Sequence, residues 1–251
     1  MKIRMVTLFF ILLLFASILL NGGLLYALKK YYAQSRLTAV FPTHESFYRQ
    51  ANLKLPPKTQ KRIVLFGDSR IQEWKDLPNI ANVEFINRGI GGETTAQLRA
   101  RLETDVLKLN PDVVILQMGI NDLVTLGVAN EVEQKAIIQQ CDENLKLVVE
   151  ALTQAHIQVI LLTIIPPAQP HLLRWMVWSE VIAQQVEEIN QSWLKRAATQ
   201  TNQFLHLIDT AATLKNQQGQ WHSNVHRDTL HLTATGYDHL NQAVLPILQP
   251  Y

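Results

Sequence analysis

The amino-acid sequence predicts an α/β protein in which a doubly wound parallel sheet forms the middle of three layers, with an N-terminal transmembrane helix in front of it. Short, almost continuous apolar segments alternate with longer helical segments over most of the chain, as in a parallel sheet. Because these apolar segments lack alternating polar residues, they are typical of strands buried on both faces. A long uncharged stretch near the amino terminus predicts the membrane helix.

The first element is the uncharged stretch from Val6 to Leu28. Its 23 residues, at ~1.5 Å rise per residue, span roughly 35 Å and can cross a bilayer. Since no small-residue cleavage site is clear, we expect residues 1–30 to form an uncleaved, single-pass anchor, with a long, removed signal peptide as the alternative. Basic residues flank both ends, and we favour a cytoplasmic amino terminus with the rest of the chain outside the cytoplasm.

Residues 31–58 have scattered charges, three prolines and weak periodicity, which is typical of a tether. Part of this tether can be helical and pack on the domain after it. We expect residues 59–251 to form one globular domain, because this length buries one sizeable core.

The domain begins with a short β-branched and aromatic run, and runs of the same kind recur between longer segments of helical pattern. We expect strands at Ile63–Phe66, Val83–Ile86, Val113–Met118, Val159–Ile164 and Phe204–Ile208. We expect helices at Thr94–Lys108, Val132–Ala155, Val177–Thr199 and Thr233–Leu245, the last one stopped by Pro246.

Composition excludes several classes of function. The net charge is only +2, and the Lys and Arg residues form no stripe interleaved with aromatic residues, so nucleic acid is not an expected partner. The single cysteine, Cys141, excludes an internal disulfide and a Cys-based zinc site, and its helical surroundings indicate a small buried side chain.

Polar and glycine residues follow several strands at similar distances. Ser69 lies three residues after Phe66, Gly91 and Gly92 lie a few residues after the second strand, and Asn121 lies three residues after the third. Because ligands of parallel sheets bind beyond the carboxyl ends of the strands, we expect these residues to share one edge of the sheet.

The residues at this edge suggest nucleophilic catalysis. A serine hydroxyl needs a base within hydrogen-bond reach and a group that orients the base. Asp228 and His231, three residues apart on one loop, can meet, so that Asp228 orients the imidazole while its other nitrogen faces Ser69. The alternative is a surface histidine that merely has a carboxylate nearby.

Two further blocks supply hydrogen-bond donors. The backbone amides of Gly91 and Gly92 can approach a developing oxyanion at the start of a helix, although a tight strand-to-helix turn would have the same sequence. The side-chain amide of Asn121 can also donate to an oxyanion, or Asn121 and Asp122 can simply cap a loop or helix.

In chain order, the four blocks are Ser69, then Gly91 and Gly92, then Asn121 and Asp122, and finally Asp228 with His231. Together, they resemble the SGNH family of hydrolases, also called the GDSL esterases and lipases. The resemblance covers Ile63–Leu245 and implies a flavodoxin-like SGNH hydrolase fold. It implies Ser69 as nucleophile, His231 as general base and Asp228 as its orienting acid. It also implies an oxyanion hole made of the amides of Ser69 and Gly92 and the side chain of Asn121; Gly91 replaces Gly92 if the turn is shifted by one.

The resemblance implies a serine hydrolase that cleaves carboxylic esters of lipids or acylated glycans through an acyl-enzyme, without a metal or other cofactor. Acyl transfer to a sugar or lipid hydroxyl would use the same residues. Two other classes stay open: a non-catalytic binding module, and a metal-dependent hydrolase. The candidate metal ligands crowd the carboxyl-terminal part: His222, His226, Asp228, His231 and His239.

Two features depart from the family or extend beyond its motifs. The family's first block usually continues with Leu or Ile, whereas Arg70 follows Ser69 here; we expect Arg70 to pair with an acid on the first helix, with a substrate contact as the alternative. The loop Ile164–Trp178, which contains Trp175, can line an acyl pocket or touch a membrane surface. Alternatively, it is helix core preceded by a proline turn.

Overall fold

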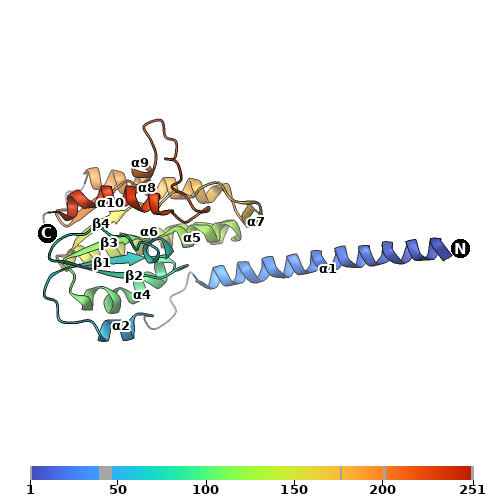
Figure 1. The fold of residues 1–251 in the computed structure, drawn as a ribbon, viewed down its shortest axis with the longest axis horizontal. Helices are drawn as coiled ribbons and strands as arrows, with labels where there is room; N and C mark the ends of the chain where they lie inside the picture. Colours follow the sequence, from blue (N-terminus) through green and yellow to red (C-terminus); the bar gives the residue numbers. More distant parts are fainter. Residues whose placement is uncertain (1, 40–46, 176, 200–201, 250–251) are drawn as a thin grey trace. The chain divides into compact units, whose positions relative to one another are not determined.

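A computed structural model describes residues 2–39, 47–175, 177–199 and 202–249 of the chain. The chain divides into two compact units, Met1–Thr38 and Ala39–Tyr251. The helix α1 (Lys2–Ala39) makes up the first unit (Figure 1). Within Val6–Ala39 of α1, a window of 18 residues has a mean hydropathy of 2.5, and the helix is long and apolar enough to cross a membrane, a property that signal sequences share.

The second unit is built on a parallel sheet of five strands in the order β2-β1-β3-β4-β5. Its strands are β1 (Lys61–Gly67), β2 (Val83–Gly89), β3 (Val113–Gln117), β4 (Gln158–Leu162) and β5 (Leu205–Ile208). The last residue of β1 pairs with the last residues of both β2 and β3, so these three carboxyl ends are level. The predicted parallel sheet is confirmed.

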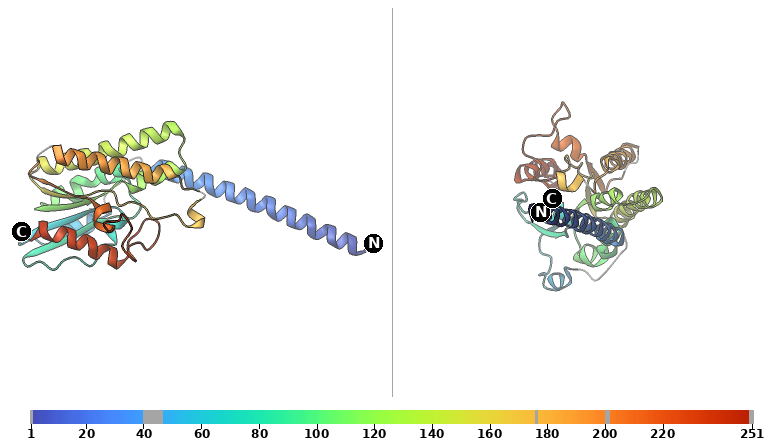
Figure 2. Two further views of the ribbon diagram at one scale, coloured as in Figure 1. Left: turned by 90° about the horizontal axis from the view of Figure 1, so that it is seen from above. Right: turned by 90° about the vertical axis from the view of Figure 1, so that its right-hand side faces the viewer.

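Helices cover both faces of the sheet, with α6 and α8 on one face and α10 on the other (Figure 2). The longer helices are α4 (Thr95–Asp105), α6 (Glu131–Gln154), α8 (Glu180–Thr199) and α10 (Ala234–Leu248). The shorter ones are α2 (Arg49–Leu53), α3 (Ser69–Gln72), α5 (Ile120–Val124), α7 (Leu172–Trp175) and α9 (Thr210–Leu214), with 3₁₀ turns η1 (Leu107–Leu109) and η2 (Thr125–Gly127). The predicted three-layer arrangement is confirmed.

The core on the α10 side is continuous from the central strands to the last helix. Buried residues of β1, β3 and β4 pack there against Trp74 and the apolar face of α10. The expectation that Pro246 stops the last helix is wrong, because α10 continues to Leu248, which is fully buried. Proline removes one helical hydrogen bond, but Gln249 still donates to the carbonyl of Leu245 at 2.9 Å, and burial of the apolar end offsets the loss.

Two other helix boundaries differ from the expectation by three residues. The helix expected at Val177–Thr199 begins at Glu180, and the separate turn α7 precedes it. The helix expected at Thr94–Lys108 ends at Asp105 and is followed by η1. Thr94 is instead the N-cap of α4, where its side chain forms a capping box with Gln97.

Part of the predicted tether packs on the domain. The hydroxyl of Tyr48 donates to the carbonyl of Gly89 at 2.6 Å. Asn52 on α2 donates to the carboxylate of Asp105 at 2.7 Å and accepts from the guanidinium of Arg88 at 2.8 Å. Residues 48–52 therefore belong physically to the body that carries the sheet.

Candidate active site

Ser69 lies at the carboxyl edge of the sheet, where β1 turns into α3. Asp68 is the N-cap of this helix, and its carboxylate accepts the backbone N–H two residues further on at 2.9 Å. Gly67 leaves no room for a side chain, because a Cβ there would lie 2.1 Å from the carbonyl oxygen of Gln117. The close contact of β1 with β3 thus fixes where the Ser69 hydroxyl emerges.

The structure brings Ser69, His231 and Asp228 together from elements far apart in the sequence. The hydroxyl oxygen of Ser69 lies 3.0 Å from Nε2 of His231. Nδ1 of the same imidazole lies 2.8 and 3.0 Å from the two carboxylate oxygens of Asp228. A hydroxyl, an imidazole and a carboxylate therefore form one hydrogen-bonded chain, the arrangement that can transfer a proton away from the hydroxyl.

Hydrogen bonds stabilise the ionised form of the Asp228 carboxylate. The backbone N–H groups of Leu230 and His231 both donate to its Oδ1, at 2.8 and 3.1 Å. Burial by itself would raise the pKa of Asp228, but these hydrogen bonds and the contact with the His231 side chain lower it to about 2. An ionised carboxylate accepts only, so it favours the tautomer with the proton on Nδ1 and leaves the Nε2 lone pair facing Ser69.

Asp228 and His231 lie at the tip of a narrow loop, the histidine loop (residues 225–233). Residues on its two sides are joined by hydrogen bonds from Thr233 to Val225 and from Arg227 to His231, each between backbone groups at 2.9 Å. The loop then enters α10 through Thr233, its N-cap. These backbone hydrogen bonds fix the loop in the conformation that brings the side chains of Asp228 and His231 into contact.

The glycine turn, residues 90–93 between β2 and α4, lies beside Ser69. The backbone N–H of Ile90 donates to the carbonyl of Gly67 at 3.0 Å, which places the turn at the end of β1. The N–H of Gly91 is taken up by the side-chain oxygen of Gln72 at 2.9 Å. Gly92 has φ +81°, where glycine is favoured, and within the described ranges its N–H has no hydrogen-bond partner.

Asn121 and Asp122, on α5, are tied to the same turn. The side-chain amide of Asn121 donates to the carbonyl of Glu93 at 3.0 Å, which occupies one of its two N–H groups. Asp122 accepts from the backbone N–H of Thr95 at 2.8 Å and from its hydroxyl at 2.6 Å. Asp122 therefore caps the start of α4, so the capping alternative holds for Asp122, although the helix that it caps precedes it in the chain.

Residues 65–239 match the GDSL-like lipase/acylhydrolase family. The chain belongs to this family. The match spans the serine, glycine and asparagine blocks and the histidine loop, and the predicted resemblance is confirmed.

Solved structures share the fold of this chain, and a bacterial relative is similar to part of it. A GDSL-like lipase from Bacteroides thetaiotaomicron is 24% identical, with a TM-score of 0.63 over 80% of this chain and 97% of that one. The lipase/acylhydrolase from Enterococcus faecalis is 24% identical, with a TM-score of 0.54 over 76% and 96% of the two chains. The uncharacterized lipoprotein YqeF of Bacillus subtilis is 32% identical over 120 residues, 41% of this chain; the chain spans about half (48%) of that relative's length.

Sequence reasoning missed a buried cation that supports this acylhydrolase-family site. The guanidinium of Arg101 donates to the carbonyl of Arg88 at 2.9 Å and pairs with Glu93 at 2.6 Å and with Asp105 at 3.1 Å. Arg101 is only 3% exposed and lies over the ring of Phe66. It joins the ends of β1 and β2 to the glycine turn, but nothing in the local pattern of α4 distinguishes it from a surface arginine.

The expected pairing of Arg70 with an acid on the first helix is wrong. The acid at the end of α3, Glu73, pairs with Arg227 at 3.0 Å and not with Arg70. Arg70 is buried, and its Nε donates to the carbonyl of Leu230 at 2.8 Å. The side chain is directed into the protein because the histidine loop covers it, which local sequence could not indicate.

The candidate metal ligands of the sequence do not gather into one cluster among the described residues. His222 stacks on His239 with ring centres 4.4 Å apart, whereas His226 packs against Trp221. In the part of the chain that the structure describes, no three His, Cys, Asp or Glu residues are grouped so that they can hold a metal ion. Cys141 is buried on α6, as expected.

The proline-rich loop after β4 packs beside the histidine loop. The backbone N–H of Ala168 donates to the carbonyl of Thr229 at 2.9 Å. On α7, Trp175 is 69% exposed, so it is not helix core. Trp178 is half-buried beneath the guanidinium of Arg174. An exposed aromatic side chain thus lies on the segment next to the candidate site.

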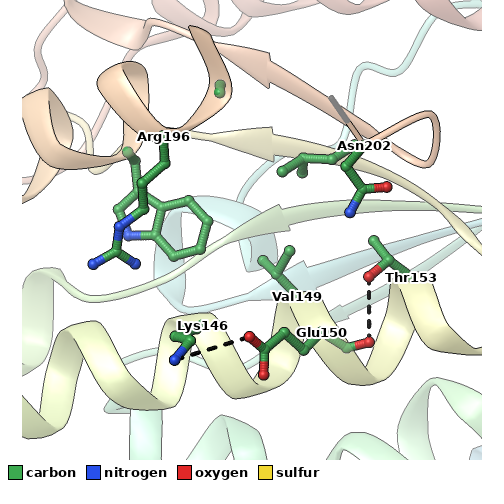
Figure 3. A pocket seen from close by; sticks show the side chains of 9 residues that line it. Lys146, Val149, Glu150, Thr153, Arg196 and Asn202 are labelled. Carbon is green, nitrogen blue, oxygen red and sulfur yellow. Dashed lines mark hydrogen bonds and ion pairs between the residues drawn. The ribbon is translucent and has the colours of Figure 1, made fainter. Parts of the chain in front are cut away.

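A cavity of about 400 Å³ between α6 and α8 is separate from this site (Figure 3). It is lined by the carboxyl-terminal half of α6 and the first residue of β5, Leu205. It therefore opens at the amino ends of the strands, the edge opposite to Ser69, and none of the residues of the candidate site lines it.

Proposed function

We propose that this protein is a serine hydrolase that cleaves carboxylic esters through an acyl-enzyme intermediate. The single observation that carries the proposal is the hydrogen-bonded chain from Ser69 Oγ to His231 Nε2, 3.0 Å, and from His231 Nδ1 to Asp228, 2.8 Å. This is the geometry in which an imidazole accepts the serine proton as the hydroxyl attacks. Membership of a family of acylhydrolases supports the same reaction.

The reaction begins when Ser69 attacks the acyl carbonyl and His231 takes the serine proton. The tetrahedral intermediate then expels the alcohol, to which His231 returns the proton, and the acyl group stays on Ser69. Water, deprotonated by His231, attacks this ester, and collapse of the second intermediate releases the acid and restores the serine. Asp228 keeps the imidazole in place and stabilises its charged form in both steps.

The oxyanion is held by the backbone amides of Ser69 and Gly92 and by the side chain of Asn121. Gly92 is preferred to Gly91 because the N–H of Gly91 already bonds Gln72. Asn121 gives one N–H to Glu93 and keeps the second for the oxyanion. Fixed donors of this kind stabilise charge that develops only in the transition state.

The substrate is an ester of a lipid or of an acylated glycan at a membrane. The exposed Trp175 beside the site and the membrane-length helix α1 support this choice. Residues 1–30 serve as the anchor, residues 31–58 connect it to the domain of residues 59–251, and the domain lies outside the cytoplasm.

Replacing Ser69 by Ala tests the proposal. Turnover of p-nitrophenyl acetate falls by at least 10³-fold, as expected on loss of a nucleophile, and the protein no longer reacts with a fluorophosphonate probe. Ser223→Ala, at an exposed serine ahead of the histidine loop, is the matched control and keeps full turnover. Undiminished turnover in Ser69→Ala would refute the assignment, and product analysis with a sugar acceptor would identify acyl transfer.

A further inference from the structure

Arg70, the residue that follows the serine, contacts a part of the chain that is distant in sequence. It is 2% exposed, and its Nε donates to the carbonyl of Leu230 at 2.8 Å, 160 residues away. That carbonyl belongs to the peptide group between Leu230 and His231. The N–H of the same planar peptide group donates to Asp228 at 3.1 Å. One rigid unit is therefore held by Arg70 at one end and holds Asp228 at the other.

The backbone of Arg70 is itself fixed. Its N–H is held by the carboxylate of Asp68 at 2.9 Å, and its carbonyl accepts from the hydroxyl of Tyr237 on α10 at 2.8 Å. The side chain therefore projects from a rigid point, one residue from the Ser69 hydroxyl. A contact from such a point sets the distance between the serine and the histidine loop.

Keeping this side chain buried has a cost. Burial lowers the pKa of Arg70 to about 10, so the guanidinium is still charged at neutral pH. Its two terminal nitrogens and Oδ2 of Asp68 find no hydrogen-bond partner among the described residues. A leucine or isoleucine, which the family resemblance leads us to expect here, would avoid the desolvation of a cation. Packing alone thus gives no reason for an arginine, whereas the contact with Leu230 does.

We propose that Arg70 is a positioning residue that holds the Leu230–His231 peptide group, and through it Asp228 and His231, in line with Ser69. This inference rests on the proposed function. Arg70 is buried beneath the histidine loop, so it acts through that loop and not by touching substrate. Its loss therefore reduces the chemical step and leaves substrate binding nearly unchanged.

A second arginine provides a matched control. Arg227 also joins the histidine loop to the serine side of the site, through its ion pair with Glu73 at 3.0 Å. The Arg227 side chain is 53% accessible, and its nearest approach to the carboxylate of Asp228 is a longer ion pair of 3.7 Å. Exposed ion pairs contribute little, and Arg227 does not hold the carbonyl of Leu230.

The experiment compares Arg70→Met, Arg70→Lys and Arg227→Met in the full chain, in detergent micelles, with p-nitrophenyl acetate. Methionine keeps a long apolar stem but cannot donate. We expect kcat to fall by about 100-fold in Arg70→Met, the effect of roughly 1 Å of misplacement, with KM within about twofold. Arg70→Lys, which has a donor, recovers to within about tenfold of wild type, and Arg227→Met stays within about threefold.

A low-field proton resonance from Nδ1 of His231 supplies a readout of the site itself. It shifts or broadens in Arg70→Met and is unchanged in Arg227→Met. Wild-type kcat in folded Arg70→Met, or equal losses in Arg70→Met and Arg227→Met, would overturn the proposal. If Arg70→Met does not fold, Arg70→Lys decides: kcat within about tenfold supports the positioning role, and a larger loss in a folded protein contradicts it.

Failure of this inference is distinguishable from failure of the proposed function. If Ser69→Ala keeps its turnover, the hydrolase assignment itself is wrong. If Ser69→Ala is inactive while Arg70→Met matches wild type, the hydrolase assignment stands and only the positioning role is lost.

Discussion

At the scale of single residues, the environment of Asp228 determines its part in the chemistry. Two backbone N–H groups and an imidazole surround its carboxylate, and they lower its pKa although burial opposes them. The same contacts orient His231. A change that removes the negative charge but keeps the size of the side chain therefore tests charge and tautomer together.

Asp228→Asn is expected to lower kcat by about 10⁴-fold, because an amide favours the wrong imidazole tautomer. It also changes the dependence of stability on pH. With a pKa of about 2 in the folded protein and ~3.9 when unfolded, Asp228 stabilises the fold above about pH 4, and this contribution disappears as pH falls through about 2. Urea denaturation of wild type and Asp228→Asn at pH 2 to 7 measures the difference, which a pH-independent gap would contradict.

Gly92 and Gly219 allow backbone strain to be separated from catalysis. Both have positive φ, +81° and +74°, and an added Cβ at either one would meet no atom within 4 Å. Alanine at each position should therefore cost about 1–2 kcal/mol of stability. Only Gly92→Ala is expected to lower kcat, by about tenfold or more, because it tilts an oxyanion donor. Thermal unfolding and ester turnover of the two variants check this, and equal kcat values would remove Gly92 from the oxyanion hole.

At the scale of elements, the site is assembled by contacts between secondary-structure ends. The histidine loop packs on the serine end of β1 through Arg70 and on the proline-rich loop through Thr229. The glycine turn is joined to α5 through Asn121 and to α4 through Arg101. These connections explain why the candidate residues share one edge without being close in sequence.

The segment around α7 is predicted to bind the acyl chain of the substrate. Trp175→Ala should reduce turnover of long-chain p-nitrophenyl esters by about tenfold, since a buried aromatic contact contributes about 1.5 kcal/mol or more, and should leave acetate turnover nearly unchanged. Val132→Ala removes another exposed apolar side chain, on α6, and serves as the control. Equal effects of Trp175→Ala on short and long esters would show that α7 does not select chain length.

At the scale of the whole molecule, the two compact units differ in composition and structure. The first is an apolar helix, and the second carries the sheet and the candidate site. The boundary matters for any soluble fragment, because Tyr48 and Asn52 bond to the sheet-bearing body. A fragment must keep these residues to retain the native contacts of Arg88, which is 6% exposed.

After alkaline extraction, the full chain is expected to stay in the membrane fraction, whereas a chain without residues 1–38 is expected in the soluble fraction. Its kcat for p-nitrophenyl acetate should lie within about twofold of that of the full chain. Deleting residues 1–57 should also solubilise it but lower its stability by about 1–3 kcal/mol, because Arg88 loses the hydrogen bond to Asn52. Equal melting temperatures of the two fragments would contradict the second expectation, and a full chain that is extracted from membranes would contradict the first.

The sequence by itself determined the sheet, because each strand is a local apolar run, and the serine, glycine and asparagine residues of the candidate site each follow such a run closely. It also indicated that Asp228 and His231 can meet, since three residues of one loop separate them. The ends of elements were less predictable: α10 passes through Pro246 because Leu248 is buried by distant strands.

Only the tertiary structure decided which groups meet across the site. The 3.0 Å contact of Ser69 with His231, the occupation of the Gly91 amide by Gln72, and the contact of Arg70 with Leu230 each join separate elements. Such contacts depend on how elements pack and on which backbone groups remain unpaired. Local sequence specifies neither, because a side chain carries no information about the carbonyl that will lie opposite it.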